Sequence, residues 1–248
     1  MLAVKVFIFS PVQENTCLLY NEQNDCIIID PGCYYAEEQE TLASFIAQKA
    51  LTPRLLLNTH CHLDHVFGNK WVAEKYGLKL HLHEKEKPVL DYAPASGLMW
   101  NLPFDNYTGD VIYLRENDTI TLGADVLEVF FTPGHSPGSI VFYCRQQQFV
   151  IGGDVLFRMS VGRTDLPGGN HNTLLNSIRT KLFVLPDESF TRVMENLPPS
   201  GLKKSTTHMW DLKFEIRDLR FDPGCRFQGA NMRMGDGGHK VKSINADL

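Results

Sequence analysis

The stretch that most constrains this chain is Thr59-His60-Cys61-His62-Leu63-Asp64-His65, which places four metal-binding side chains within six residues. It follows the apolar run Leu55-Leu56-Leu57, which predicts a buried strand. The amphipathic pattern over residues 66–76 predicts a helix directly after it. The fold must therefore present these side chains where a strand gives way to a helix. Imidazole and carboxylate groups together suit zinc, manganese or iron.

The spacing within this run predicts two neighbouring metal positions. His60 and His62 alternate, so in an extended segment both side chains leave the backbone on the same side. Asp64 and His65 come where the chain turns into the helix, and we expect them to point elsewhere. The alternative is that these are solvated histidines in a loop. That interpretation would be favoured for a single His, but not for this run at a junction between a strand and a helix.

The composition indicates an ordinary globular protein without a nucleic-acid or membrane partner. The 248 residues are 43% hydrophobic and 21% charged, and the net charge of -5 gives no basic footprint. No apolar run approaches the roughly 20 residues of a membrane span. Six cysteines without a C-x-x-C pair do not suggest a disulfide framework. With no basic leader at the start, the expected compartment is the cytoplasm.

Strand-rich segments interrupted by helices predict two sheets between helices. Strands are expected at 3–9, 16–20, 26–29, 55–57, 78–83, 111–114, 119–122, 125–131, 140–144 and 148–151. Helices are expected at 37–50, 66–76 and 171–183. Residues 84–110 are rich in Pro and aromatic side chains, and we expect an irregular loop there that forms a substrate lid or a cap.

Further ligand-type residues stand at the ends of other predicted strands. His135 lies in a turn framed by Pro and Gly, and Asp154 follows Gly152-Gly153. Asp30 lies at the end of the strand at 26–29. It could be a catalytic carboxylate or one that orients a loop beside the metal ligands, and we favour the orienting role. His81 and His83 share one strand face, where we expect surface side chains rather than ligands.

Four motifs together resemble the metallo-β-lactamase fold superfamily over residues 1 to about 188. They are Ile29-Asp30-Pro31-Gly32, His60-x-His62-x-Asp64-His65, Thr132-Pro133-Gly134-His135-Ser136-Pro137-Gly138-Ser139 and Gly152-Gly153-Asp154. The stretch 162–169, G-R-T-D-L-P-G-G, resembles the short glyoxalase II-like hydrolases within it. The resemblance implies an α/β (α+β) fold, an αββα sandwich over residues 1–190, with a two-metal site at its edge.

The resemblance also implies the roles of the site residues. One metal would be held by His60, His62 and His135, the other by Asp64 and His65, with Asp154 bridging them. The family binds two zinc ions, and iron or manganese is possible. Its chemistry is attack of metal-bound hydroxide on a small-molecule thioester such as S-lactoylglutathione, with Asp64 assisting the proton transfer.

Two residues beside the ligands have more ordinary interpretations. Arg163 could hold a substrate carboxylate or tie down its own loop through Asp165, and we favour the second. Cys61 stands between two ligands, and we expect it to be structural and to point away from them.

The end of the chain departs from the family pattern. The family has a further His ligand in a G-H-G turn after a later strand, and residues 187–201 contain no His. From residue 191 the balance of charges turns from net negative to net positive, and residues 224–248 show no periodicity. Residues 191–248 are therefore expected to form an atypical tail.

A shift of reading frame would explain this departure. Codons can be chosen for Phe190 to Asp211 such that the same DNA, read in a shifted frame, encodes V-Y-P-G-H-G-E-P-T-T-I-G-F-E-K-K-H-N-P-Y-V-G. This string resembles the family ending, so we expect a frameshift near residue 189. As written, the chain should bind nearer one metal than two. His208 and His239 do not lie in strand-end turns and are not expected to replace the missing ligand.

The sequence is compatible with three functions and predicts no particular oligomeric state. The leading one is a glyoxalase II-like thioester hydrolase. The second is a persulfide dioxygenase with a single iron on His60, His135 and Asp154. The third is an inactive product that binds one metal.

Overall fold

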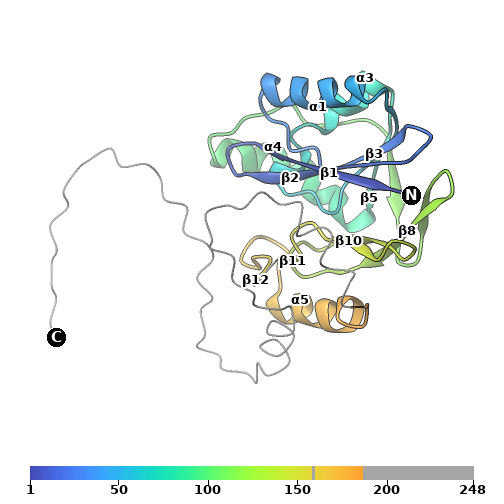
Figure 1. The fold of residues 1–248 in the computed structure, drawn as a ribbon. Coiled ribbons are helices and arrows are strands. Elements are labelled where there is room, and N and C mark those ends of the chain that lie inside the picture. Colours follow the sequence, from blue (N-terminus) through green and yellow to red (C-terminus); the bar gives the residue numbers. More distant parts are fainter. Residues whose placement is uncertain (158–159, 187–248) are drawn as a thin grey trace, which may run out of the picture. The chain divides into compact units, whose positions relative to one another are not determined.

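The structure is a computed structural model that describes residues 1–157 and 160–186. The predicted tail at 191–248, the proposed frameshift, His208 and His239 lie outside these residues. Two sheets lie between layers of helices (Figure 1), which confirms the predicted αββα sandwich. Within the described ranges, no helix is long and apolar enough to cross a membrane.

The first sheet contains six strands that follow one another in chain order. They are β1 (Ala3–Phe9), β2 (Glu14–Tyr20), β3 (Asp25–Ile29), β4 (Thr52–Leu57), β5 (Leu80–His83) and β6 (Val111–Leu114). The pairs β1–β2 and β2–β3 are antiparallel, and β3 to β6 are parallel. Parallel neighbours need a crossover connection. These crossovers contain α1 (Ala36–Gln48), then α2 (Leu63–Val66) with α3 (Asn69–Tyr76), and finally α4 (Lys87–Met99).

The second sheet is antiparallel and has the order β10-β9-β8-β7. Its strands are β7 (Thr119–Leu122), β8 (Asp125–Phe131), β9 (Ile140–Cys144) and β10 (Phe149–Ile151). A small ribbon follows, made of β11 (Leu156–Phe157) and β12 (Ser160–Val161). The chain then forms α5 (His171–Ser177) and a short π-helical segment, η2 (Ile178–Leu182). In Figure 1, α5 lies on the opposite side of the molecule from α1 and α3.

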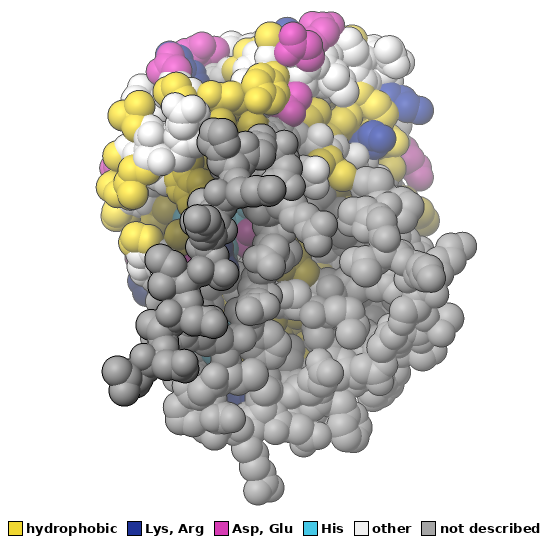
Figure 2. Space-filling view, turned by 90° about the vertical axis from the view of Figure 1, so that its left-hand side faces the viewer, with side chains coloured by type: hydrophobic (Ala, Val, Ile, Leu, Met, Phe, Trp, Pro, Cys, Tyr) yellow, Lys and Arg dark blue, Asp and Glu magenta, His cyan; other side chains and the backbone are white. Residues whose placement is uncertain are grey.

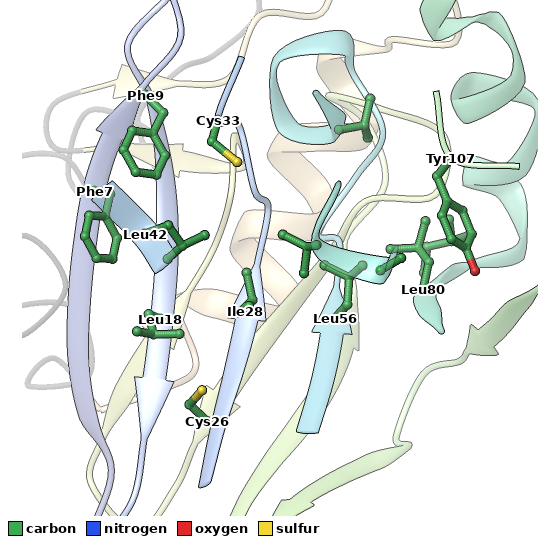
Figure 3. Close-up of a cluster of buried hydrophobic side chains, with 14 of the residues drawn as sticks. Phe7, Phe9, Leu18, Cys26, Ile28, Cys33, Leu42, Leu56, Leu80 and Tyr107 are labelled. Carbon is green, nitrogen blue, oxygen red and sulfur yellow. The ribbon is translucent and has the colours of Figure 1, made fainter. Parts of the chain in front are cut away.

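Strict alternation along the central strands builds the buried layers. On β3, Ile28 faces a cluster that includes Leu42 of α1 (Figure 3), while Ile27 faces the other sheet. On β9, Phe142 faces the first sheet, and Tyr143 packs in the cluster of α5. All five side chains are almost fully buried. Because neighbouring residues serve different layers, each of these strands is apolar on both faces.

The expectation of an irregular loop at 84–110 is wrong for residues 84–99, whereas residues 100–110 contain no helix or strand. The segment forms a short 3-10 turn, η1 (Glu84–Glu86), followed by the thirteen-residue helix α4. Pro94 inside α4 cannot donate to the carbonyl of Leu90. Asn106 Nδ2 donates to that carbonyl instead, at 2.7 Å. A side chain from the following loop thus compensates for a residue that normally breaks helices.

Two smaller expectations also need correction. The helix predicted at 66–76 is split into α2 and α3, and at the break the Gly68 amide donates to the Pro31 carbonyl at 2.7 Å. His83 is not a surface side chain but is buried, and its ring stacks on Phe131 with 4.4 Å between centroids. The reason is that its strand face packs toward the second sheet. His81 is half-buried, with Nδ1 3.2 Å from the Leu56 carbonyl oxygen.

We predict that Asn106→Ala destabilises the protein by about 1–3 kcal/mol, because the buried Leu90 carbonyl loses its donor. The free energy of unfolding in urea measures the loss. In a Pro94→Ala background the restored amide can donate to Leu90, so Asn106→Ala should cost less than half as much. An equal cost in both backgrounds would contradict this account of α4.

Candidate metal centre

The centre lies where strand ends of both sheets meet. β3 and β4 are parallel, so their carboxyl ends share one edge; Asp30 follows β3 directly, and His60 is the third residue after β4. In the second sheet, the turn from β8 to β9 contains His135, and Asp154 follows β10. The Ile140 amide donates to the Thr59 carbonyl at 2.9 Å, which ties β9 to the loop after β4.

Three histidine side chains converge on one point. His62 Nδ1 lies 2.8 Å from His135 Nε2, which in turn lies 3.0 Å from His60 Nε2. His60 and His135 are buried, and His62 is half-buried. Their ligand atoms all lie within 4.8 Å of one another, so the structure brings together the first predicted metal-binding group.

Hydrogen bonds on the far side of the rings fix the tautomers of His60 and His135. His135 Nδ1 donates to the Arg163 carbonyl at 2.7 Å, so Nε2 of the neutral ring has no proton. Thr59 Oγ1 donates its only proton to Asp30 Oδ2 at 2.6 Å and therefore accepts from His60 Nδ1 at 3.1 Å. Two bare nitrogen lone pairs thus face each other at 3.0 Å. Such a donor set fits a cation between them.

Burial keeps these three rings neutral. It lowers the pKa of His60 and His135, and it lowers the pKa of His62 to about 3, with the neighbouring rings lowering it further for His60 and His62. Metal ligation requires neutral imidazole. The first group is therefore ready to bind at neutral pH.

The second predicted group lies directly beside the first. His65 Nε2 is 3.4 Å from Asp154 Oδ1 and 3.7 Å from Asp64 Oδ2. The other oxygen of Asp154, Oδ2, lies 3.7 Å from His135 Nε2. The two oxygens of Asp154 thus face the two histidine groups, as a bridging ligand would require.

The second group, unlike the three neutral rings of the first, contains charged side chains. Burial alone would lower the pKa of His65, but the carboxylates of Asp64, Asp154 and Asp30 raise it well above its usual range. Burial opposes ionisation of Asp154 as well, yet His65 and its neighbours lower the pKa of that carboxyl to about 2. His65 and Asp154 therefore form an ion pair when no metal is present.

Asp30 orients the ligands rather than standing free. Its Oδ1 accepts from the Thr59 amide at 2.7 Å and from Asn58 Nδ2 at 3.2 Å, and its Oδ2 accepts from the Thr59 hydroxyl. Oδ2 also lies 3.1 Å from His65 Nδ1. One buried carboxylate thus supports His60 through Thr59 and faces His65 directly, which favours the predicted orienting role.

The contacts of Arg163 bear on whether it supports its own loop or could bind a substrate carboxylate. Its guanidinium makes two bonds to Asp165, at 2.7 and 2.8 Å, within the same exposed loop. These contacts favour the loop-supporting interpretation over a carboxylate-binding one. The side chain of Cys61 is fully buried in the core beneath the helices, away from the ligand atoms.

Two buried carboxylates near the centre, Glu14 and Glu86, were not predicted from the sequence. Glu14 Oε1 lies 3.7 Å from His65 Nδ1, and Glu14 Oε2 accepts from Thr16 Oγ1 at 2.9 Å. Glu86 contacts the loops on both sides of the first group. Neither residue belongs to a ligand-spaced pattern, so no local signal marks them.

A cavity of about 400 Å³ opens beside the second group. Asp64, His65 and Asp154 line it together with Glu14 and Asp30, and the rest of the wall is largely apolar, from β1, β10, β11 and η2. Among the described residues that line it, there is no Lys or Arg. In Figure 2, a small area of histidine and acidic side chains is visible among hydrophobic ones.

Residues 10–188 match the sequence model described as the metallo-beta-lactamase superfamily. This chain belongs to that superfamily. The match ends at residue 188, just before the segment in which the predicted tail begins.

Several known proteins resemble the chain over most of their length. The probable metallo-hydrolase YqgX of Bacillus subtilis is 40% identical over 182 residues, covering 72% of this chain and 83% of its own. The hydroxyacylglutathione hydrolase GloC of Haemophilus influenzae is 33% identical over 187 residues, covering 75% and 86%. A crystal structure of TTHA1623 in a di-iron-bound form has a TM-score of 0.67 at 34% identity, covering 74% and 88%.

We predict that Thr59→Val weakens metal binding about 10-fold or more, because His60 Nδ1 loses its acceptor and its link to Asp30. Competition with a chromophoric chelator measures the dissociation constant. Thr59→Ser keeps the hydroxyl and should stay within about threefold of wild type. Equal weakening in both variants would contradict this account, because Thr59→Ser keeps the hydroxyl and both of its hydrogen bonds.

Proposed function

We propose that this protein is a metal-dependent hydrolase that cleaves a small-molecule thioester of the hydroxyacylglutathione type. The observation that carries the proposal is the pair of adjacent ligand groups that share Asp154. The similarity to a protein named hydroxyacylglutathione hydrolase adds support for the thioester. Zinc is the proposed metal, with iron or manganese as alternatives, since one relative was solved with two irons.

The residues divide the proposed chemistry between them. A bound metal lowers the pKa of water and polarises a carbonyl oxygen. His60, His62 and His135 would hold the cation as neutral donors, and Asp154 would face both positions. The Asp64 side chain is 25% exposed, but the partial removal of its carboxyl from water, together with the charge of Asp154, raises the pKa of that carboxyl. Asp64 Oδ2 is therefore placed to take up a proton from the attacking water.

We predict that the metal-loaded protein hydrolyses S-lactoylglutathione faster than lactones or phosphoesters. Asp64→Asn should lower kcat by about 100-fold or more, because it removes both a ligand and a proton acceptor. Release of the thiol, followed with a thiol reagent, measures the rate. Asp105→Asn is the matched control, since among the described residues that exposed carboxylate pairs with Lys70 on the surface. A metal-loaded protein inactive on every thioester tested would contradict the proposal.

The second metal position is the weaker one in the proposed centre. Among the described residues, the proposed first position has the three histidines His60, His62 and His135 with Asp154 beside His135, while the proposed second has Asp64, His65 and Asp154. The cavity lies beside these last three side chains. We infer that the ending encoded in the shifted frame supplies the missing ligand there.

We therefore predict a metal content nearer one than two per chain, measured by elemental analysis after dialysis. A chain repaired to the shifted frame from residue 190 should bind two metals and gain activity. Resequencing tests the frameshift directly. Two fully bound metals in the chain as written would contradict the inference.

A persulfide dioxygenase is the second candidate function. His60, His135 and Asp154 approach one point closely enough to hold a single iron, with 3.0 Å between the two Nε2 atoms. Iron content together with oxygen consumption on glutathione persulfide would favour this function. Thiol release from thioesters without oxygen uptake would favour the hydrolase.

A further inference from the structure

Glu86 links the two loops that contain the three converging histidines. Its Oε2 accepts from the Cys61 amide at 2.7 Å, between His60 and His62. Its Oε1 accepts from Ser136 Oγ and from the Gly138 amide, both at 2.6 Å, just after His135. Glu86 is fully buried and ends η1, on a third element between β5 and α4. One carboxylate thus joins segments that are far apart in the sequence.

All three partners donate to Glu86, so only a carboxylate satisfies them. A backbone amide can only donate, and the Ser136 hydroxyl points its proton at Oε1. Burial raises the pKa of Glu86, and the three hydrogen bonds counter that rise. An amide in this place would turn one NH₂ group toward an N–H or O–H donor. The link therefore depends on the carboxylate and not only on the shape of the side chain.

The loop after His135 is built to approach Glu86 closely. A Cβ added to Gly138 would lie 2.8 Å from both the Cγ and the backbone nitrogen of Glu86. Only glycine leaves room for this contact. Ser139 Oγ accepts from the Ser136 amide at 3.1 Å and closes the same turn. The approach of this loop to Glu86 thus defines where His135 stands.

We propose that Glu86 is a positioning residue of the metal centre, whose carboxylate sets the spacing between the His60–His62 loop and the His135 loop. The proposal rests on the proposed metal centre but not on the identity of the substrate. If the link loosens, the Nε2 atoms of His60 and His135 no longer keep the separation that suits one cation. Loss of such supporting contacts typically weakens metal binding about 10- to 100-fold.

Three variants of the full chain test the proposal. Glu86→Gln keeps the shape but places a donor against a donor, and Ser136→Ala removes one bond of the three. Tyr107→Phe is the matched control, because it removes a 2.6 Å bond to the Asp110 carbonyl in the same helix-side core without touching either loop. For each, we would measure the Zn²⁺ dissociation constant by chelator competition, the visible spectrum of the Co²⁺-loaded protein, and the Tm of the metal-free protein.

We expect Glu86→Gln to weaken Zn²⁺ binding about 10- to 100-fold and to change the Co²⁺ spectrum, with a smaller effect for Ser136→Ala. Tyr107→Phe should lower the Tm and leave affinity and spectrum unchanged. Affinity within threefold of wild type and an unchanged spectrum in Glu86→Gln would overturn the proposal. If Glu86→Gln does not fold, the same two readouts in Ser136→Ala decide. A wild-type protein that binds Zn²⁺ but cleaves no thioester would contradict the proposed function alone.

Discussion

The structure is organised around two unprotonated imidazole nitrogens, of His60 and His135, that face each other at 3.0 Å. Lone pairs at this distance repel unless a cation lies between them, so something must hold both rings in place. The holding groups are the Thr59 hydroxyl with Asp30 on one side and the Arg163 carbonyl on the other. Each ring is thus fixed from behind, and the site is preorganised for a metal.

The two packed sheets keep the loops of the metal centre in a fixed geometry. Central strands that are apolar on both faces bury three continuous layers, so the strand ends are rigid. Loops at those ends can then present buried polar groups without losing their geometry. Asp30 and Glu86 serve as internal supports, since each satisfies several donors from the loops. Stability of the layers and precision of the centre are therefore linked.

Much of this architecture was predictable because short stretches of sequence indicate the strands and the turns that follow them. Short apolar runs bounded by turn residues identified β3 and β9, and ligand-type residues in turns after strands identified His135 and Asp154. The helix α4 was missed because the cost of Pro94 is offset by Asn106, twelve positions further along, which no local rule anticipates. Glu86 was missed because its partners lie 25 to 52 residues away. Its role exists only once the sheets have brought the loops together.

The histidines of the first group are neutral and His65 is charged, and this difference affects metal binding at the two proposed positions. The first group is neutral before any metal arrives, so ligation there displaces no proton from His60, His62 or His135. His65 is a cation in its ion pair with Asp154 and must give up a proton to become a ligand. Filling the second position is therefore a metal-for-proton exchange. In the proposed two-metal centre, acidification would therefore favour the protonated form of His65 over its binding of a metal.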